Sequence, residues 1–217
     1  MHSDVSTYPT ASSPRWALVM LAAALAMLVA SGIQPHDRAG WLLENMLPVA
    51  LLAGLSLAWH WWRLSAQSYF AMLLLFGVHE LGAHFTYAEV PYDEWARQLS
   101  GQSLDQAMEW RRNQYDRLVH FSYGLLFVLP IREVLARLTP LRGAWLLFVA
   151  WHLVLSTSAI YELIEWVGGA YLGDDQAEAF LATQEDPWDA QKDMALAALG
   201  AGISLAALAL VSVRRGP

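Results

Sequence analysis

Two long stretches without a charged residue limit what this chain can fold into. They are Trp16–Ile33 and Met194–Val213, and both are predominantly apolar. As α-helices they are long enough to cross the hydrocarbon core of a bilayer, which is about 30 Å thick. Four more apolar segments lie between them, at residues 41–62, 68–87, 118–136 and 143–171. The sequence therefore predicts an all-α integral membrane bundle of about six transmembrane helices.

The composition agrees with a chain that is surrounded by lipid. Hydrophobic residues make up 56% of the sequence and charged residues 15%, and the mean hydropathy is +0.32. An average soluble domain has about 25% charged residues. The chain has no cysteine, which excludes disulfides and thiolate metal sites. Its net charge of −7 argues against binding to nucleic acid, which requires a basic face.

The six segments leave little sequence for a soluble domain. Residues 1–15 are rich in Ser, Thr and Pro and are predicted to be a disordered cytoplasmic tail. Residues 16–215 then form a single transmembrane domain. Its first span is longer than the apolar region of a cleaved signal peptide, so we expect it to be retained.

Two connections carry further signals. The third loop contains the breakers Pro91 and Gly101, and Leu104–Tyr115 has the composition of a helix, which predicts a short interfacial helix. Before the last span, Asp186 and Pro187 have the pattern of an N-cap and a first helical residue. In the fifth span, Gly168–Gly169 indicates a stop or a bend.

An even number of spans places both termini on the same side of the membrane. The short loops on that side contain Arg63, Arg137 and Arg142, with few acidic residues, whereas the acidic residues gather on the other side. Positive charge in short loops favours the cytoplasm. We therefore predict that both termini are cytoplasmic.

Four segments carry, near one end, two ionisable residues that are one helical turn apart. These pairs are Glu80/His84, Asp116/His120, Glu162/Glu165 and Asp189/Asp193. Their spacing of three or four residues puts both members of a pair on the same helix face. An acidic or basic group near the centre of a span costs about 2.5–3.5 kcal/mol, so such groups usually face the interior of a bundle. Span order puts all four pairs at the extracytoplasmic ends of spans three to six, which predicts one shared polar cavity.

The residue types of this cavity suit catalysis or metal binding. Candidate catalytic residues are Glu80, His84, Asp116, His120, Glu162 and Glu165. All eight paired residues, including Asp189 and Asp193, are candidate ligands. Carboxylate oxygens suit Mg²⁺ or Mn²⁺, and added imidazole suits Zn²⁺. The neighbouring Arg111, Arg112 and Arg117 would contact an anionic headgroup, or would instead neutralise the acidic residues in a purely structural ion-pair network.

Four ordered motifs resemble a known family. They are HELGAHFTYAEVP at 79–91, NQYDRLVHFSYG at 113–124, YELIEW at 161–166 and DPWDAQKDM at 186–194. Together they resemble the YjdF-like family of bacterial inner-membrane proteins, which has no established function. More distantly, Asp116-x-x-x-His120, Glu165 and the Asp-x-x-x-Asp motif resemble the VanZ-like family, which is associated with the cell envelope. The resemblance implies a multi-pass inner-membrane protein and adds no reaction.

Three kinds of function remain open at this point. The first is a membrane-embedded enzyme that uses a metal, or a Glu/His pair, to act on a lipid-linked or anionic envelope substrate. The second is a proton- or ion-coupled transporter, although spans one to three and four to six show no clear internal repeat. The third is a non-catalytic protein that binds a lipid or a partner.

Overall fold

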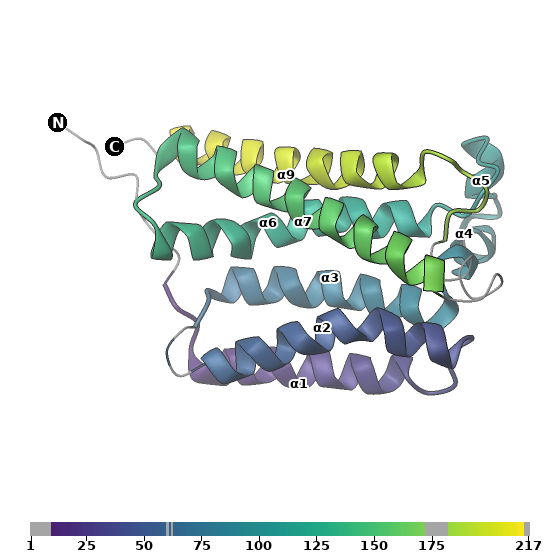
Figure 1. Cartoon of the computed structure of the whole chain (residues 1–217), viewed down its shortest axis with the longest axis horizontal. Coiled ribbons are helices and arrows are strands. Elements are labelled where there is room, and N and C mark those ends of the chain that lie inside the picture. The colour runs from purple at the N-terminus through teal and green to yellow at the C-terminus, as the bar shows by residue number, and fades with distance from the viewer. Residues whose placement is uncertain (1–9, 60, 62, 172–181, 215–217) are drawn as a thin grey trace.

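The computed structural model describes residues 10–59, 61, 63–171 and 182–214, and these residues form a bundle of antiparallel helices (Figure 1). Its six long helices are α1 (Pro14–Ser31), α2 (Arg38–Ala58), α3 (Ala66–Phe85), α6 (Tyr115–Leu138), α7 (Gly143–Tyr171) and α9 (Asp189–Arg214). Consecutive long helices run in opposite directions, so α1 begins and α9 ends at the same end of the bundle. We call the other end, where α3 and α7 finish and α6 and α9 begin, the polar end.

Five of these helices are long and apolar enough to cross a membrane, namely α1, α2, α6, α7 and α9. The sixth expected span corresponds to α3, which falls outside this set because it is less apolar. It nevertheless runs the length of the bundle beside α1 and α6 (Figure 1). Its buried Ser68 and Glu80 face other helices rather than lipid. The prediction of an all-α membrane bundle is confirmed, and the count of six crossings stays a prediction that depends on α3.

The backbones of α6 and α9 touch because glycine occupies the contact on both helices. A Cβ added at Gly124 of α6 would lie 1.8 Å from the carbonyl oxygen of Ala197. One added at Gly200 of α9 would lie 2.3 Å from the carbonyl oxygen of Phe121. Small residues at such positions let membrane helices pack closely. A larger residue at Gly124 or Gly200 would therefore force the two helices apart.

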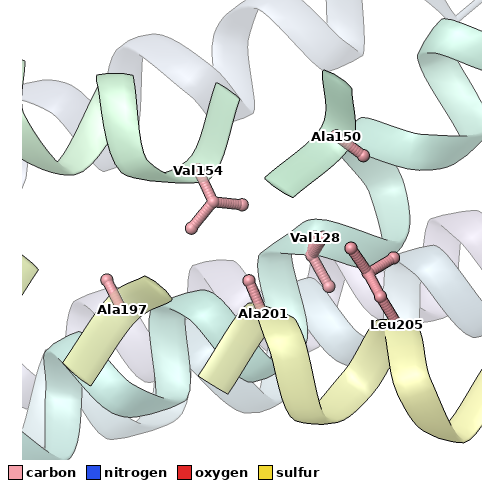
Figure 2. Close-up of a cluster of buried hydrophobic side chains, with 6 residues drawn as sticks. All are labelled: Val128, Ala150, Val154, Ala197, Ala201 and Leu205. Atoms are coloured by element: carbon pink, nitrogen blue, oxygen red, sulfur yellow. The ribbon is translucent and has the colours of Figure 1, made fainter. Parts of the chain in front are cut away.

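An apolar cluster continues this contact toward the middle of the bundle and joins α7 to it (Figure 2). Its fully buried members are Val128, Ala150, Val154, Ala197, Ala201 and Leu205. The alanines of α9 alternate with larger side chains from α6 and α7, so the three helices interdigitate. This packing fixes the register of α6 against α9.

At the end opposite the polar end, α6 is joined to the start of α3 by one fully bonded carboxylate. The Oε1 atom of Glu133 accepts a hydrogen bond from the Ser65 backbone N–H at 2.8 Å and is paired with Arg137. Its Oε2 atom accepts hydrogen bonds from the hydroxyls of Ser65 at 2.7 Å and Ser68 at 2.5 Å. Ser65 is also the N-cap of α3. Glu133 is 2% exposed, and its partners explain how a carboxylate is accommodated there.

The third loop differs from the prediction of one helix over Leu104–Tyr115. It contains a 3₁₀ turn (Tyr87–Glu89), α4 (Tyr92–Ser100) and the four-residue α5 (Leu104–Ala107), all at the polar end (Figure 1). Helix α4 ends at Gly101, which takes a φ of 75°. Helix α5 ends early because Glu109 takes a φ of 55° and the N–H groups of Glu109 and Trp110 fold back onto α5 carbonyls. This is a Schellman-type C-cap, which short-range sequence signals do not reveal without a glycine.

Three other boundaries also differ. Helix α7 continues through Gly168–Gly169 to Tyr171, because glycines inside a long apolar helix weaken it without ending it. Helix α9 begins at Asp189, three residues after the expected cap Asp186, whose carboxylate instead accepts the Trp188 N–H. Residues 1–9 of the expected tail lie outside the described residues, while Ser12 donates its N–H to Leu64.

The α6–α9 contact predicts opposite effects for two glycine-to-alanine substitutions. Gly200→Ala forces the two backbones apart and should cost about 1–3 kcal/mol of stability. Gly54→Ala, in α2, meets nothing within 4 Å and should leave stability unchanged or raise it by up to about 1 kcal/mol. Thermal melting of both variants in detergent measures the difference. Equal melting temperatures would show that α6 and α9 do not touch as described.

The expected orientation can be tested with single cysteines, because the chain has none of its own. Gln102 lies exposed between α4 and α5, and Pro140 lies exposed in the turn between α6 and α7, at the opposite end. With cytoplasmic termini, Gln102→Cys reacts with a membrane-impermeant maleimide on spheroplasts, and Pro140→Cys reacts only after lysis. The reverse pattern would invert the topology.

Candidate functional site

Three of the predicted site residues converge between α6 and α9. Asp116, His120 and Asp193 each offer a ligand atom, and these atoms lie within 4.8 Å of one another. All three residues are buried, with exposed fractions of 7%, 7% and 2%. The α6–α9 contact explains the convergence, since His120 lies one turn before Gly124 and Asp193 one turn before Ala197. We call these three residues the acidic triad.

A fourth residue reaches the acidic triad from α7. The Nε2 atom of His120 lies 3.6 Å from the carboxylate of Asp116 and 3.6 Å from Oε1 of Glu162. These distances are too long for hydrogen bonds and short enough for a shared ligand between the groups. The side chain of Glu162 is 10% exposed. Three helices thus bring three carboxylates and one imidazole to one place.

Within the described residues, this cluster has fewer hydrogen bonds than its polar atoms can make. Oε1 of Glu162 and Oδ1 of Asp193 are buried with no hydrogen-bond partner. Glu133, by contrast, has partners on both carboxylate oxygens. A buried carboxylate oxygen without a partner is costly, and a native structure usually keeps one where an ion, a proton or water belongs.

The two members of the pair Asp189/Asp193 have different surroundings: Asp193 belongs to the acidic triad, and Asp189 belongs to an outer layer of ion pairs. Arg112 pairs with Asp189 and donates to the backbone carbonyls of Thr183 at 3.0 Å and Ala182 at 3.1 Å. Arg117 lies 2.5 Å from Asp186 and 3.5 Å from Asp189. These contacts tie the loop before α9 to the start of α6, directly outside the acidic triad.

Asp186 is the centre of the outer layer. The Lys192 ammonium donates to its carboxylate at 2.5 Å, and the Trp188 N–H at 3.1 Å. These hydrogen bonds, with that from Arg117, lower the pKa of Asp186 to about 2, so it is ionised at any physiological pH. Of the three candidate headgroup arginines, Arg112 and Arg117 are occupied in this layer and Arg111 is exposed.

The structure places Glu80 and His84 apart from the acidic triad, although they lie at the same end of the bundle. Both contact α1 at one residue. The Ser31 hydroxyl donates to Glu80, and the Nδ1 atom of His84 lies 2.8 Å from the Ser31 backbone oxygen. The Oε1 atom of Glu80 has no hydrogen-bond partner among the described residues. Of the four predicted pairs, the structure thus brings together Asp116, His120, Asp193 and Glu162, whereas Glu80 and His84 contact α1, and a shared function for these residues stays a prediction.

A cavity of about 580 Å³ adjoins the acidic triad. Asp116 and His120 form part of its wall, as does Glu165 of α7. The remaining wall is largely apolar and comes from α1, α2, α3, α6 and α7. The cavity therefore connects the interior of the bundle, at membrane depth, with the candidate metal ligands.

Sequence reasoning missed four polar residues of this cavity: Glu44, His79, Tyr87 and Tyr161. The Tyr161 hydroxyl donates to Glu44 at 3.0 Å, which joins α7 to α2. The Tyr87 hydroxyl lies 2.5 Å from Nδ1 of His79. Glu44 lies within an apolar span and could have been found by that signal alone, but it has no ionisable neighbour one turn away.

The fold and this cluster define a polytopic helical membrane protein with a polar site buried near one membrane face. The chain belongs to the family described as predicted membrane protein (DUF2238), which it matches over residues 16–214. It is also similar to the inner membrane protein YjdF of Escherichia coli (strain K12). The two are 37% identical over 177 residues, which cover 81% of this chain and 80% of that protein. No solved structure matches the chain.

These comparisons confirm the YjdF-like resemblance, and the more distant VanZ-like resemblance stays a prediction. With the membrane-spanning helices, they support a multi-pass protein of the bacterial inner membrane. They assign no activity to the family.

The contrast between bonded and unbonded carboxylates predicts a difference in stability between two isosteric substitutions. Glu133→Gln weakens charge-assisted hydrogen bonds and should cost about 1.5–3 kcal/mol. Asp193→Asn removes one of several crowded negative charges and should leave the melting temperature unchanged or higher. Both variants are melted in chelator-containing detergent. If Asp193→Asn melts as low as Glu133→Gln, the acidic triad is a structural network.

Proposed function

We propose that the acidic triad and Glu162 bind one divalent metal ion, and that the protein is a metal-dependent membrane-embedded enzyme acting on a lipid or lipid-linked envelope substrate. One observation carries this proposal. Asp116 and His120 are at once members of the acidic triad and part of the wall of an apolar cavity inside the bundle. A ligand whose chain occupies the cavity would thus present its polar end to the metal.

The donor set suits the ion. Metal–ligand bonds of about 2.0–2.2 Å, as for Zn²⁺ or Mg²⁺, hold the ligand atoms roughly 3–4 Å apart. Two distances of 3.6 Å around His120 agree with this, with small adjustments at Asp193. Carboxylates with one imidazole favour Mn²⁺, Zn²⁺ or Fe²⁺ over Ca²⁺. A divalent cation would also offset the mutual repulsion of Asp116, Glu162 and Asp193.

The chain's own residues would divide the remaining work. Asp116, His120, Asp193 and Glu162 would hold the metal, whose Lewis acidity would supply the activation that hydrolysis or group transfer needs near neutral pH. Glu165 lines the cavity one turn from Glu162, where a carboxylate can accept a proton from the attacking group. The ion pairs of Arg112 and Arg117 hold α6 and α9 together outside the acidic triad and so orient Asp116 and Asp193.

The transporter alternative has less support from the described residues. An ion or proton path would have to continue from the acidic triad to the opposite end of the bundle. Between them, α6, α7 and α9 meet in the fully buried cluster around Val128, Val154 and Ala201 (Figure 2). The acid beyond it, Glu133, has all its hydrogen bonds made within the protein. A polar site at one end of the bundle, without a polar path to the other end among the described residues, fits an enzyme better than a proton or ion transporter.

Metal content tests the proposal. Protein purified through a tag without histidine should contain about one equivalent of a transition metal, and His120→Gln and Asp193→Asn should each lose at least 90% of it. His152→Gln is the matched control, because His152 is exposed on α7 and its Nδ1 atom bonds to the Phe148 carbonyl of its own helix. Loss of metal should coincide with loss of turnover in extracted envelope lipids. Equal metal content in His120→Gln and His152→Gln would refute the site.

A further inference from the structure

The cavity beside the acidic triad is long and has a different chemistry at each end. Along α2 its wall runs from Glu44 to Trp59, a distance of about 22 Å at 1.5 Å per residue. From Leu47 to Leu55, the side chains that face the cavity from α2 are hydrocarbon, and Leu73 and Phe76 add apolar wall from α3. Several polar groups farther along the wall are already bonded within the protein: the Ser56 hydroxyl donates to the Leu52 carbonyl, the Tyr69 hydroxyl accepts the Leu64 N–H, and the Tyr123 and Thr157 hydroxyls bond each other. Most of the length of the wall is thus apolar. It suits a hydrocarbon chain lying roughly along the membrane normal.

The polar end of the cavity has both hydrogen-bond donors and acceptors. Glu44, Asp116 and Glu165 supply carboxylates, and Tyr161 supplies a phenol. His79 supplies a ring nitrogen, Nε2, that is buried and has no hydrogen-bond partner in the described part of the chain. Its other nitrogen is held by the Tyr87 hydroxyl at 2.5 Å, so the ring is fixed in orientation.

The wall of this cavity contains no arginine or lysine among the described residues. The nearest basic residues of the site, Arg112 and Arg117, are bonded to Asp186, Asp189 and the loop before α9. Three carboxylic acids line the cavity, and Glu162 and Asp193 belong to the adjoining metal-ligand cluster. An anionic head would find no cation in this wall to pair with, and an unpaired buried charge is costly.

We propose that the cavity binds a lipid alcohol, that is, a lipid with a long hydrocarbon chain and an uncharged head bearing hydroxyl groups. This proposal names the substrate class of the proposed enzyme. It rests on the proposed function, because the bound lipid is a substrate only if the protein is an enzyme. A hydroxyl both donates and accepts hydrogen bonds, which matches carboxylates mixed with phenol and imidazole groups. An ammonium head only donates and would leave any proton on Nε2 of His79 without an acceptor. A phosphate head only accepts and brings negative charge.

Three lipid probes with the same C18 hydrocarbon chain differ in their head groups: 1-oleoylglycerol is an uncharged alcohol, 1-oleoyl-lysophosphatidate is an anion, and oleylamine is a cation. Purified full-length protein in detergent is titrated with each probe in the presence of chelator, so that the result does not depend on metal. Near ten times its dissociation constant, 1-oleoylglycerol should raise the melting temperature by about 3–6 °C. The other two should raise it by less than a third of that. An equal or larger effect of either charged probe would overturn the assignment of the head.

Two variants of α1 test whether the chain occupies the cavity. Ala24 is buried and lines the cavity, whereas Ala26 is exposed on the same helix and lies outside the cavity wall. Ala24→Phe should abolish the shift caused by 1-oleoylglycerol, and Ala26→Phe should retain it. If Ala24→Phe does not fold, Leu51→Trp fills the same cavity from α2. A full shift in the cavity-filling variant would overturn the proposal.

The two proposals fail in different ways. A shift with 1-oleoylglycerol, in a protein that binds no metal, would keep the lipid alcohol and refute the metal enzyme. Stoichiometric metal without a shift from 1-oleoylglycerol would refute the lipid alcohol and keep the metal site. Native mass spectrometry of the protein as purified gives a second measure, since a retained neutral lipid is expected and a retained phospholipid in the cavity is not.

Discussion

The backbone contact between α6 and α9 determines most of what is specific about this bundle. In lipid there is no hydrophobic force between helices, so a close approach must come from shape. Gly124 and Gly200 supply that shape, and carbonyl oxygens of the facing helix fill the space where side chains would be. One turn toward the polar end, the same register brings His120 and Asp193 together. The candidate metal ligands are thus positioned by two residues that have no side chain.

Helix α6 shows how the same chemical group can have two roles. Near its end, Glu133 is surrounded by donors from the start of α3 and by Arg137, and every oxygen is bonded. Near its beginning, Asp116 faces other acidic residues and a cavity. The first arrangement gives the bundle a rigid joint and leaves no capacity for a ligand. The second arrangement lowers the free energy of unfolding, which is expected at a site where a bound ligand compensates for the repulsion.

The sequence predicts the membrane class well because lipid imposes a simple length and polarity rule on each span. It also places Asp116, His120, Glu162 and Asp193 at one end, because antiparallel order alone decides that. It cannot separate Glu80 and His84 from them, since the direction of α3 toward Ser31 depends on packing between spans far apart in sequence. For the same reason it misses the cavity, whose walls come from five helices.

The cavity also explains why α2 and α7 have little direct contact, although α3 packs directly against α6. In water, an apolar gap of this size between α2 and α7 would cost stability, whereas in a bilayer a lipid chain can fill it with dispersion contacts similar to those of a side chain. The Tyr161–Glu44 hydrogen bond spans this gap at its polar end. A chain entering the cavity would place its head among Glu44, Tyr161 and His79, facing Asp116 and His120. If the proposed function holds, the gap between α2 and α7 would also be the route by which a membrane-borne substrate reaches the buried carboxylates.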